Sequence, residues 1–160
     1  WLSVRMNGVL RYPPLLHFFR AVSWLGNGIF WYSLMLTLLV QRGNEAVPAV
    51  LHMAAVGVAC TLAYALLKRG TVRPRPYQVM PAIAAGALPL DAYSFPSGHT
   101  LHAVAFTIVA ASYYPGHAGL LGAFAALTAA SRIVLGLHYP SDVLAGAAIG
   151  GGIAAASLWV

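Results

Sequence analysis

The sequence predicts an all-α protein: a polytopic transmembrane helical bundle of about five spans with an interfacial helical segment before it. Hydrophobic residues make up 60% of the 160 residues and charged residues only 8%, whereas a soluble domain carries about 25% charged residues. So few charges cannot cover a water-facing surface. We treat residues 1–160 as one membrane-embedded domain, with residues 1–20 as the interfacial segment and residues 21–160 as the bundle.

The elements follow from the distribution of apolar residues along the chain. Residues 1–20 mix arginines with leucines and phenylalanines, which predicts one or two amphipathic segments at the membrane surface. A spanning helix needs roughly 17–25 residues, and the predicted spans are residues 21–40, 46–67, 100–114, 118–137 and 142–160. In the last span, Gly146 and Gly150 are four residues apart, which allows a neighbouring helix to approach closely.

The long connection between the second and third predicted spans contains five prolines and an apolar stretch that is too short to span. That stretch can be interfacial, re-entrant or packed as a loop over the helix ends. The sequence is compatible with all three positions of this stretch.

Six charged or titratable residues lie near the ends of the predicted spans. The second span ends on one side of the membrane, the third starts there, the fourth returns and the fifth starts there again. One span more or fewer would separate the six residues. The predicted order therefore brings these residues to one membrane face: Lys68, Arg75, His99, Arg132, His138 and Asp142.

Three cations in one place are unfavourable without an anion, and arginine and lysine both suit a phosphate. Ser97 is placed to cap the third span, and Gly98 allows an anion to approach the unpaired N–H groups there. His138 and Asp142 can meet across the break before the last span, where a carboxylate would fix the imidazole tautomer and leave the other nitrogen free to attack. His99 is then available as a proton donor, so these residues suffice for phosphomonoester cleavage without a metal.

Three stretches resemble the motifs of the type 2 phosphatidic acid phosphatase superfamily. KRGTVRPRP (68–76), PSGH (96–99) and SRIVLGLHYPSD (131–142) match K-x6-R-P, P-S-G-H and S-R-x5-H-x3-D in residue type, spacing and order. The resemblance implies a membrane-embedded lipid phosphatase without metal or cofactor. It assigns His138 as the nucleophile that forms a phosphohistidine, Asp142 as its orienting group and His99 as the acid that protonates the leaving alkoxide and later activates water. It assigns phosphate binding to Lys68, Arg75, Ser97, the Gly98 amide and Arg132.

We therefore expect a multi-pass protein of a bacterial inner membrane whose partners are the bilayer and a lipid phosphate. Phosphatidate, phosphatidylglycerol phosphate, polyprenyl phosphates or diphosphates and lipid A phosphates all fit this description. A nucleic-acid partner is not expected, because no basic tract lies on a polar surface. Members of the superfamily commonly have six spans, and five are predicted here.

Other functions are compatible with some of the same residues. A lipid phosphotransferase can use the same phosphohistidine. An intramembrane metal-dependent hydrolase or transporter would use His99, His102, His138 and Asp142 as ligands, although the neighbouring cations would repel the ion. Vanadium-dependent haloperoxidases and soluble bacterial acid phosphatases share the motif residues, but the apolar spans argue against both.

Three residues near the motifs have two interpretations each. Arg73 can support the site or contact lipid headgroups, and His102, one helical turn after His99, can support the site or pack. Asp91 can cap a loop or hold one of the site cations. The sequence does not choose between these interpretations.

Overall fold

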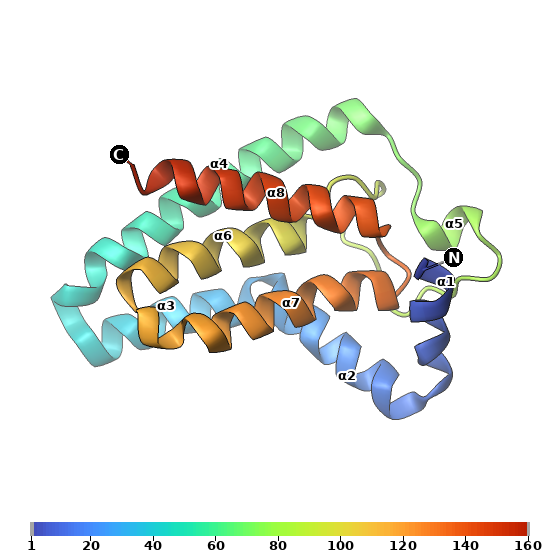
Figure 1. The fold of residues 1–160 in the computed structure, drawn as a ribbon, viewed down its shortest axis with the longest axis horizontal. Helices are drawn as coiled ribbons and strands as arrows, with labels where there is room; N and C mark the ends of the chain where they lie inside the picture. The colour runs from blue at the N-terminus through green and yellow to red at the C-terminus, as the bar shows by residue number, and fades with distance from the viewer. Residues whose placement is uncertain (1, 160) are drawn as a thin grey trace.

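The computed structural model describes residues 2–159, and these residues form helices and connecting loops without a strand. The predicted all-α class is confirmed. The longer helices run along the long axis of the molecule, and α1 and α2 extend from one end (Figure 1). In order, the α-helices are α1 (Leu2–Asn7), α2 (Pro13–Trp24), α3 (Phe30–Arg42), α4 (Val47–Thr71), α5 (Pro76–Val79), α6 (Gly98–Tyr113), α7 (Ala118–Val134) and α8 (Pro140–Ser157).

Each of the last four predicted spans corresponds to one helix, α4, α6, α7 or α8, and no helix end differs from the prediction by more than four residues. The predicted boundary at residue 20 falls within a helix, because α2 begins at Pro13 and continues to Trp24. Proline is favoured in the first helical turn, where its missing N–H costs nothing. The chain instead bends between α2 and α3, where Gly28 has a φ of 105° that glycine adopts without strain.

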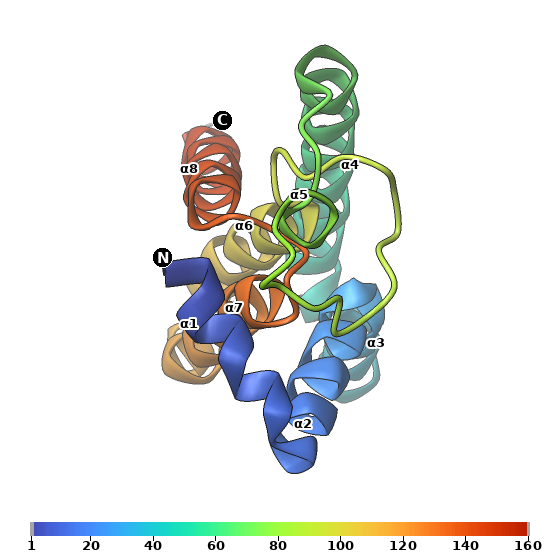
Figure 2. The same ribbon diagram turned by 90° about the vertical axis from the view of Figure 1, so that its right-hand side faces the viewer.

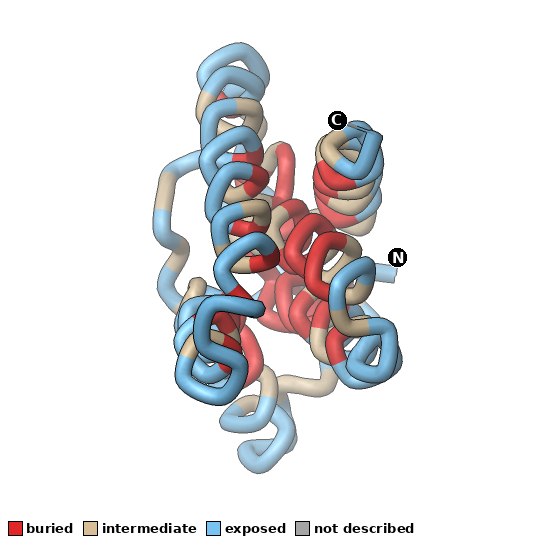
Figure 3. The backbone as a smooth tube through the Cα atoms, turned by 90° about the vertical axis from the view of Figure 1, so that its left-hand side faces the viewer, coloured by how far each residue is buried: buried red, intermediate tan, exposed pale blue. Residues whose placement is uncertain are grey.

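Length and hydropathy mark two helical stretches as candidate membrane spans, the run of consecutive helices Pro13–Val79 and the stretch Pro115–Val134. The exposed surface of the bundle is apolar, as expected for a protein surrounded by the hydrocarbon of a bilayer. The interior of the bundle is buried and the outward faces of the helices are exposed (Figure 3). Those outward faces carry large apolar side chains that are at least 60% exposed: Leu36, Leu51, Leu62, Leu66 and Leu144.

Helix α6 lies inside the bundle and packs against α4, α7 and α8. Its contact with α8 is backbone to backbone, as the glycine spacing predicted. A Cβ at Gly150 would lie 2.1 Å from the carbonyl oxygen of Leu101, and a Cβ at Gly146 would lie 2.6 Å from that of Ser97. The two glycines therefore set the distance between the helices that carry His99 and Asp142.

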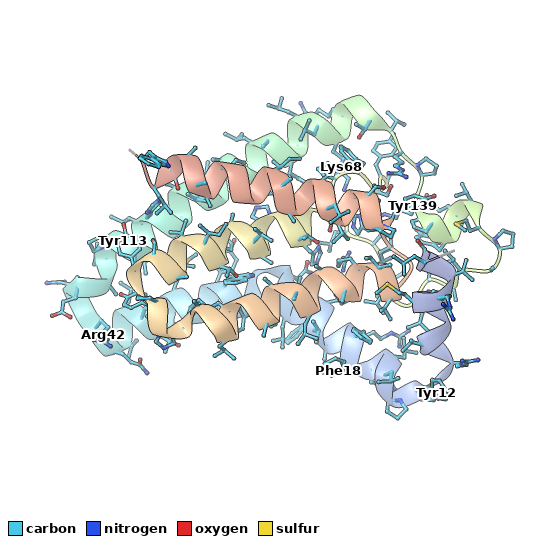
Figure 4. All side chains as sticks on the ribbon, viewed as in Figure 1. Tyr12, Phe18, Arg42, Lys68, Tyr113 and Tyr139 are labelled. Carbon is cyan, nitrogen blue, oxygen red and sulfur yellow. The ribbon has the colours of Figure 1, made fainter. Side chains whose placement is uncertain are left out.

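The ends of α4 and α7 and the starts of α6 and α8 gather at one end of the bundle (Figure 1). Lys68 and Tyr139 mark this end, and Arg42 and Tyr113 mark the opposite one (Figure 4). The connection between α4 and α6 crosses the same end (Figure 2). It packs as a loop over the helix ends, where the N–H of Gly86 donates to the carbonyl of Leu135 at 2.9 Å.

Candidate active site

A cavity of about 220 Å³ opens at this end of the bundle. The break between α2 and α3 forms one of its walls, and the first turn of α6 forms another. Six of the predicted site residues and one predicted supporting residue line it: Lys68, Arg75, Gly98, His99, Arg132, His138 and His102. Residues far apart in sequence therefore meet around one space.

His138 lies in the turn between α7 and α8, and its N–H donates to the carbonyl of Arg132 at 3.1 Å. The Nδ1 atom is 2.6 Å from the carbonyl oxygen of Ser94 and 3.8 Å from Oδ2 of Asp142. A carbonyl can only accept, so Nδ1 carries the proton and Nε2 keeps its lone pair. Nε2 lies 3.3 Å from Nη1 of Arg75 at the cavity. The acceptor nearest to Nδ1 is thus a backbone carbonyl, where the sequence had suggested Asp142.

The surroundings of His138 keep its imidazole neutral. Burial lowers the pKa of His138 to about 4, and the positive charges of Arg132 and Arg75 act in the same direction. The nearby carboxylate of Asp142 opposes this lowering of the pKa without reversing it. A neutral imidazole with an unprotonated Nε2 is the form that can attack a phosphorus atom.

Asp142 is fully buried behind His138. Its Oδ1 accepts from Nη1 of Arg73 at 2.7 Å, and its Oδ2 accepts from the N–H of Tyr139 at 2.8 Å. The Arg73 guanidinium also lies 4.1 Å from the centre of the Tyr139 ring and donates to Ser141 at 2.9 Å. The structure therefore places Arg73 on Asp142, outside the cavity lining.

Lys68 and Arg75 share one carboxylate. Oδ1 of Asp91 is 2.6 Å from Nζ of Lys68 and 2.7 Å from Nη2 of Arg75. The hydroxyl of Tyr64 donates to Oδ2 of the same carboxylate and accepts from Nζ of Lys68 at 3.0 Å. The structure supports both interpretations of Asp91, because Oδ1 also accepts from the N–H of Tyr93 at 3.2 Å and so caps the loop. Tyr64 was not singled out from the sequence, although its position one helical turn before Lys68 was a usable signal.

Arg132 reaches the cavity from the end of α7. Its Nη1 donates to the hydroxyl of Ser23 on α2, and its Nε is buried with no hydrogen-bond partner among the described residues. An unsatisfied buried N–H is costly, and this is the cost of burying Arg132 beside the cavity.

The first turn of α6 contributes residues with different surroundings. Gly98 packs against the ring of Tyr64, 2.8 Å from where its Cβ would stand. The side chain of Ser97 is buried 3.0 Å from the hydroxyl of Thr100, and its N–H donates to the carbonyl of Asp142 at 3.0 Å. Ser97 is the N-cap residue of α6, as expected, but its hydroxyl makes no capping hydrogen bond and lies behind the cavity.

His102 lines the cavity and also ties two helices together. Its Nδ1 is 2.9 Å from the carbonyl of Gly98, and its Nε2 is 3.1 Å from the hydroxyl of Thr61 on α4. Both nitrogens are engaged. Across residues 2–159, no group of three or more His, Cys, Asp and Glu side chains is arranged to hold a metal ion, so the ligand set of the metal-dependent alternative is not assembled.

Comparison with known proteins agrees with this site. The sequence model of the PAP2 superfamily matches residues 45–160, which include every motif residue. The chain belongs to the PAP2 superfamily. Its curated relatives include a lipid A 1-phosphatase of Rhizobium etli, 37% identical over 54% of this chain and 39% of the relative. The match therefore spans well under half of that protein.

Three further comparisons extend over most of the chain. A decaprenylphosphoryl-5-phosphoribose phosphatase of Mycobacterium tuberculosis is 35% identical over 89% of this chain and 78% of the relative. The crystal structure of Aquifex aeolicus LpxE has a TM-score of 0.81 and 29% identity, and the match covers 99% of this chain and 93% of that one. A transmembrane PAP2 type phosphatidylglycerolphosphate phosphatase of Bacillus subtilis, at 22% identity and a TM-score of 0.76, shares the fold.

Proposed function

We propose that this PAP2 superfamily member is a metal-independent membrane phosphatase that hydrolyses a lipid phosphomonoester or diphosphate through a phosphohistidine on His138. One observation carries the proposal. The Nε2 atom of His138 lies at a cavity that Lys68, Arg75 and Arg132 also line, while Nδ1 is anchored on the Ser94 carbonyl. A nucleophile beside three cations suits an electrophile that bears several negative charges.

In the first step, Nε2 attacks phosphorus and the bond from phosphorus to the lipid oxygen breaks. Lys68, Arg75 and Arg132 bind the phosphoryl oxygens, together with the Gly98 amide at the start of α6. Ser97 precedes Gly98, and its hydroxyl is hydrogen-bonded to that of Thr100. It thereby fixes the conformation of the turn that presents the Gly98 amide.

His99 protonates the departing alkoxide and then removes a proton from the water that attacks the phosphohistidine. The products are the dephosphorylated lipid and inorganic phosphate, and both histidines return to their starting states. Asp142 stabilises the positive charge that His138 acquires, and Arg73 holds Asp142 in place.

The proposed membrane arrangement has five crossings: α2 with α3, then α4, α6, α7 and α8. The apolar outward faces of these helices support it, and so does the concentration of the polar site at one end of the bundle (Figure 4). We place the protein in a bacterial inner membrane, where lipid phosphates are available to a site at the membrane surface.

The test is phosphate release by the purified protein from phosphatidate, phosphatidylglycerol phosphate, a polyprenyl diphosphate and a lipid A 1-phosphate. We expect turnover of at least one lipid in excess EDTA, inhibition by orthovanadate and no turnover by His138→Ala. Loss of activity in EDTA with rescue by zinc would contradict the proposal. Transfer of phosphate to an added lipid alcohol without free phosphate would instead identify a phosphotransferase.

A further inference from the structure

Asp91 lies in the cavity where the proposed mechanism requires a phosphate. Its side chain is 28% exposed, and a single oxygen, Oδ1, contacts both Lys68 and Arg75. These are two of the three cations assigned to the phosphoryl group. The carboxylate of Asp91 therefore takes the interactions that substrate oxygens would otherwise make.

The hydrogen bonds of Arg75 show how fully Asp91 occupies it. Nη2 donates to Oδ1 of Asp91 at 2.7 Å and Nε donates to the Asp91 carbonyl at 3.2 Å. Nη1 donates to the Leu137 carbonyl at 2.8 Å and lies 3.3 Å from Nε2 of His138. Arg75 is 1% exposed. A phosphate oxygen that binds Nη2 or Nε of Arg75 competes with Asp91 for that nitrogen.

The negative charge of Asp91 makes it a direct competitor of a phosphate for Lys68 and Arg75. Burial alone would raise the pKa of Asp91, but hydrogen bonds from Lys68 and Tyr64 and the charges of Lys68 and Arg75 lower it below its ordinary value. Asp91 is therefore ionised at neutral pH. A carboxylate and a phosphate bound to the same two cations repel each other strongly in a cavity of low dielectric constant.

Few interactions besides those of Asp91 hold the segment that carries it. It is anchored on both sides, by the N–H of Gly86 on the Leu135 carbonyl and by the N–H of Ser94 on the Arg73 carbonyl. Within the described chain, the hydrogen bonds of residues 87–93 all involve Asp91. Leu88 is 93% exposed and Leu90 is 67% exposed, so little packing holds the segment.

We propose that Asp91 is an internal competitor for the phosphate site and thereby sets the affinity of this site for anions. It offsets part of the positive charge of Lys68 and Arg75 in the empty site, gives up both ion pairs when a lipid phosphate binds, and re-forms them as inorganic phosphate leaves. The proposal rests on the proposed function, because it takes the cavity as the phosphate site. Its practical consequence is product release, since three cations without a competing carboxylate would retain phosphate.

Asp91→Asn tests this with little change of shape, and inorganic phosphate and orthovanadate are the probes. The variant should bind both more tightly than wild type, by about tenfold or more, because a like charge within a few ångström of the bound anion is gone. In turnover it should show stronger inhibition by inorganic phosphate. Glu45→Gln is the matched control, since it removes the same charge from an exposed turn between α3 and α4 and should leave both affinities unchanged.

The opposite result overturns the proposal. If Asp91→Asn binds phosphate equally or more weakly while its thermal unfolding matches that of Glu45→Gln, then Asp91 holds Lys68 and Arg75 in place for the substrate. Binding and hydrolysis are measured separately. If Asp91→Asn binds phosphate more tightly but the protein hydrolyses no lipid, only the proposed function is contradicted. If the protein hydrolyses a lipid but Asp91→Asn does not bind phosphate more tightly, only the Asp91 proposal is contradicted.

A second measurement tests the proposal without substituting Asp91. Spin labels on Leu88→Cys and on Leu144→Cys, both highly exposed positions, report the distance from the Asp91 segment to α8. Orthovanadate should change or broaden this distance distribution as the ion pairs of Asp91 break. An unchanged distribution at saturating orthovanadate would mean that Asp91 stays on the cations and would overturn the proposal.

Discussion

Replacement of Gly150 by alanine tests how tightly the bundle fixes the site. The added carbon would lie 2.1 Å from the carbonyl oxygen of Leu101 and 2.9 Å from its carbonyl carbon. Both partners are helix backbone, which cannot rotate away as a side chain can, so α6 and α8 must separate by roughly 1 Å to restore ordinary contact. Overpacking of this kind costs about 1–3 kcal/mol of the free energy of unfolding.

The same displacement should reach the site, although Gly150 does not touch it. The first turn of α6 carries His99, and the first turn of α8 carries Asp142. A misplacement of about 1 Å between catalytic groups can cost roughly a hundredfold in rate. We therefore expect Gly150→Ala to lose both stability and most of its kcat/KM.

Gly152→Ala is the matched control on the same helix, because its Cβ would point into open space. Alanine in place of a helical glycine should leave stability unchanged or raise it by about 0.5–1 kcal/mol. Thermal unfolding in detergent and phosphate release measure the two variants side by side. Equal stability and activity of the Gly150 and Gly152 variants would refute the reasoning about α6 and α8.

Three further predictions concern the histidines and the membrane arrangement. His99→Ala should give a burst of p-nitrophenol from p-nitrophenyl phosphate and then stall, because a good leaving group needs little protonation whereas hydrolysis of the phosphohistidine needs His99; a variant without a burst would contradict its role. Cysteines placed beside Arg75 and Ser141 should label from one side of the membrane and one beside Asn44 from the other, and labelling of the first two from opposite sides would break the five-crossing arrangement. Because burial lowers the pKa of His138 to about 4, its ring should stay neutral well below the ordinary 6.5, as ¹³C-histidine NMR compared with His138→Ala would measure; a midpoint near 6.5 would count against it.

Hydropathy predicted the helices because the bilayer imposes long apolar segments, and α4, α6, α7 and α8 each match a predicted span. It did not predict that a helix begins at Pro13, because residues 13–20 mix arginine with apolar residues. The Pro13–Pro14 pair, typical of a first helical turn, was the stronger signal.

The motif residues could be predicted to lie close together, because the order of the spans alone places them at the same end of the bundle. Asp91 could not be resolved in the same way. It lies in an irregular loop 16 residues after Arg75, with no periodicity to show where its side chain lands. The contact of His138 with Ser94 could not be predicted either. The acceptor is a backbone carbonyl, which every residue has, so the residue type at position 94 gives no signal.

The central claim is that His138 carries the phosphoryl group, and trapping of that group tests it most directly. The purified protein would be mixed with a ³²P-labelled lipid phosphate, quenched in alkali within one turnover and digested for mass spectrometry. We predict an acid-labile, alkali-stable phosphoryl group on the peptide that contains His138, accumulation of this species in His99→Ala and its absence in His138→Ala. Labelled phosphate released with no protein-bound intermediate in His99→Ala, or a phosphoryl group on any other residue, would contradict the account.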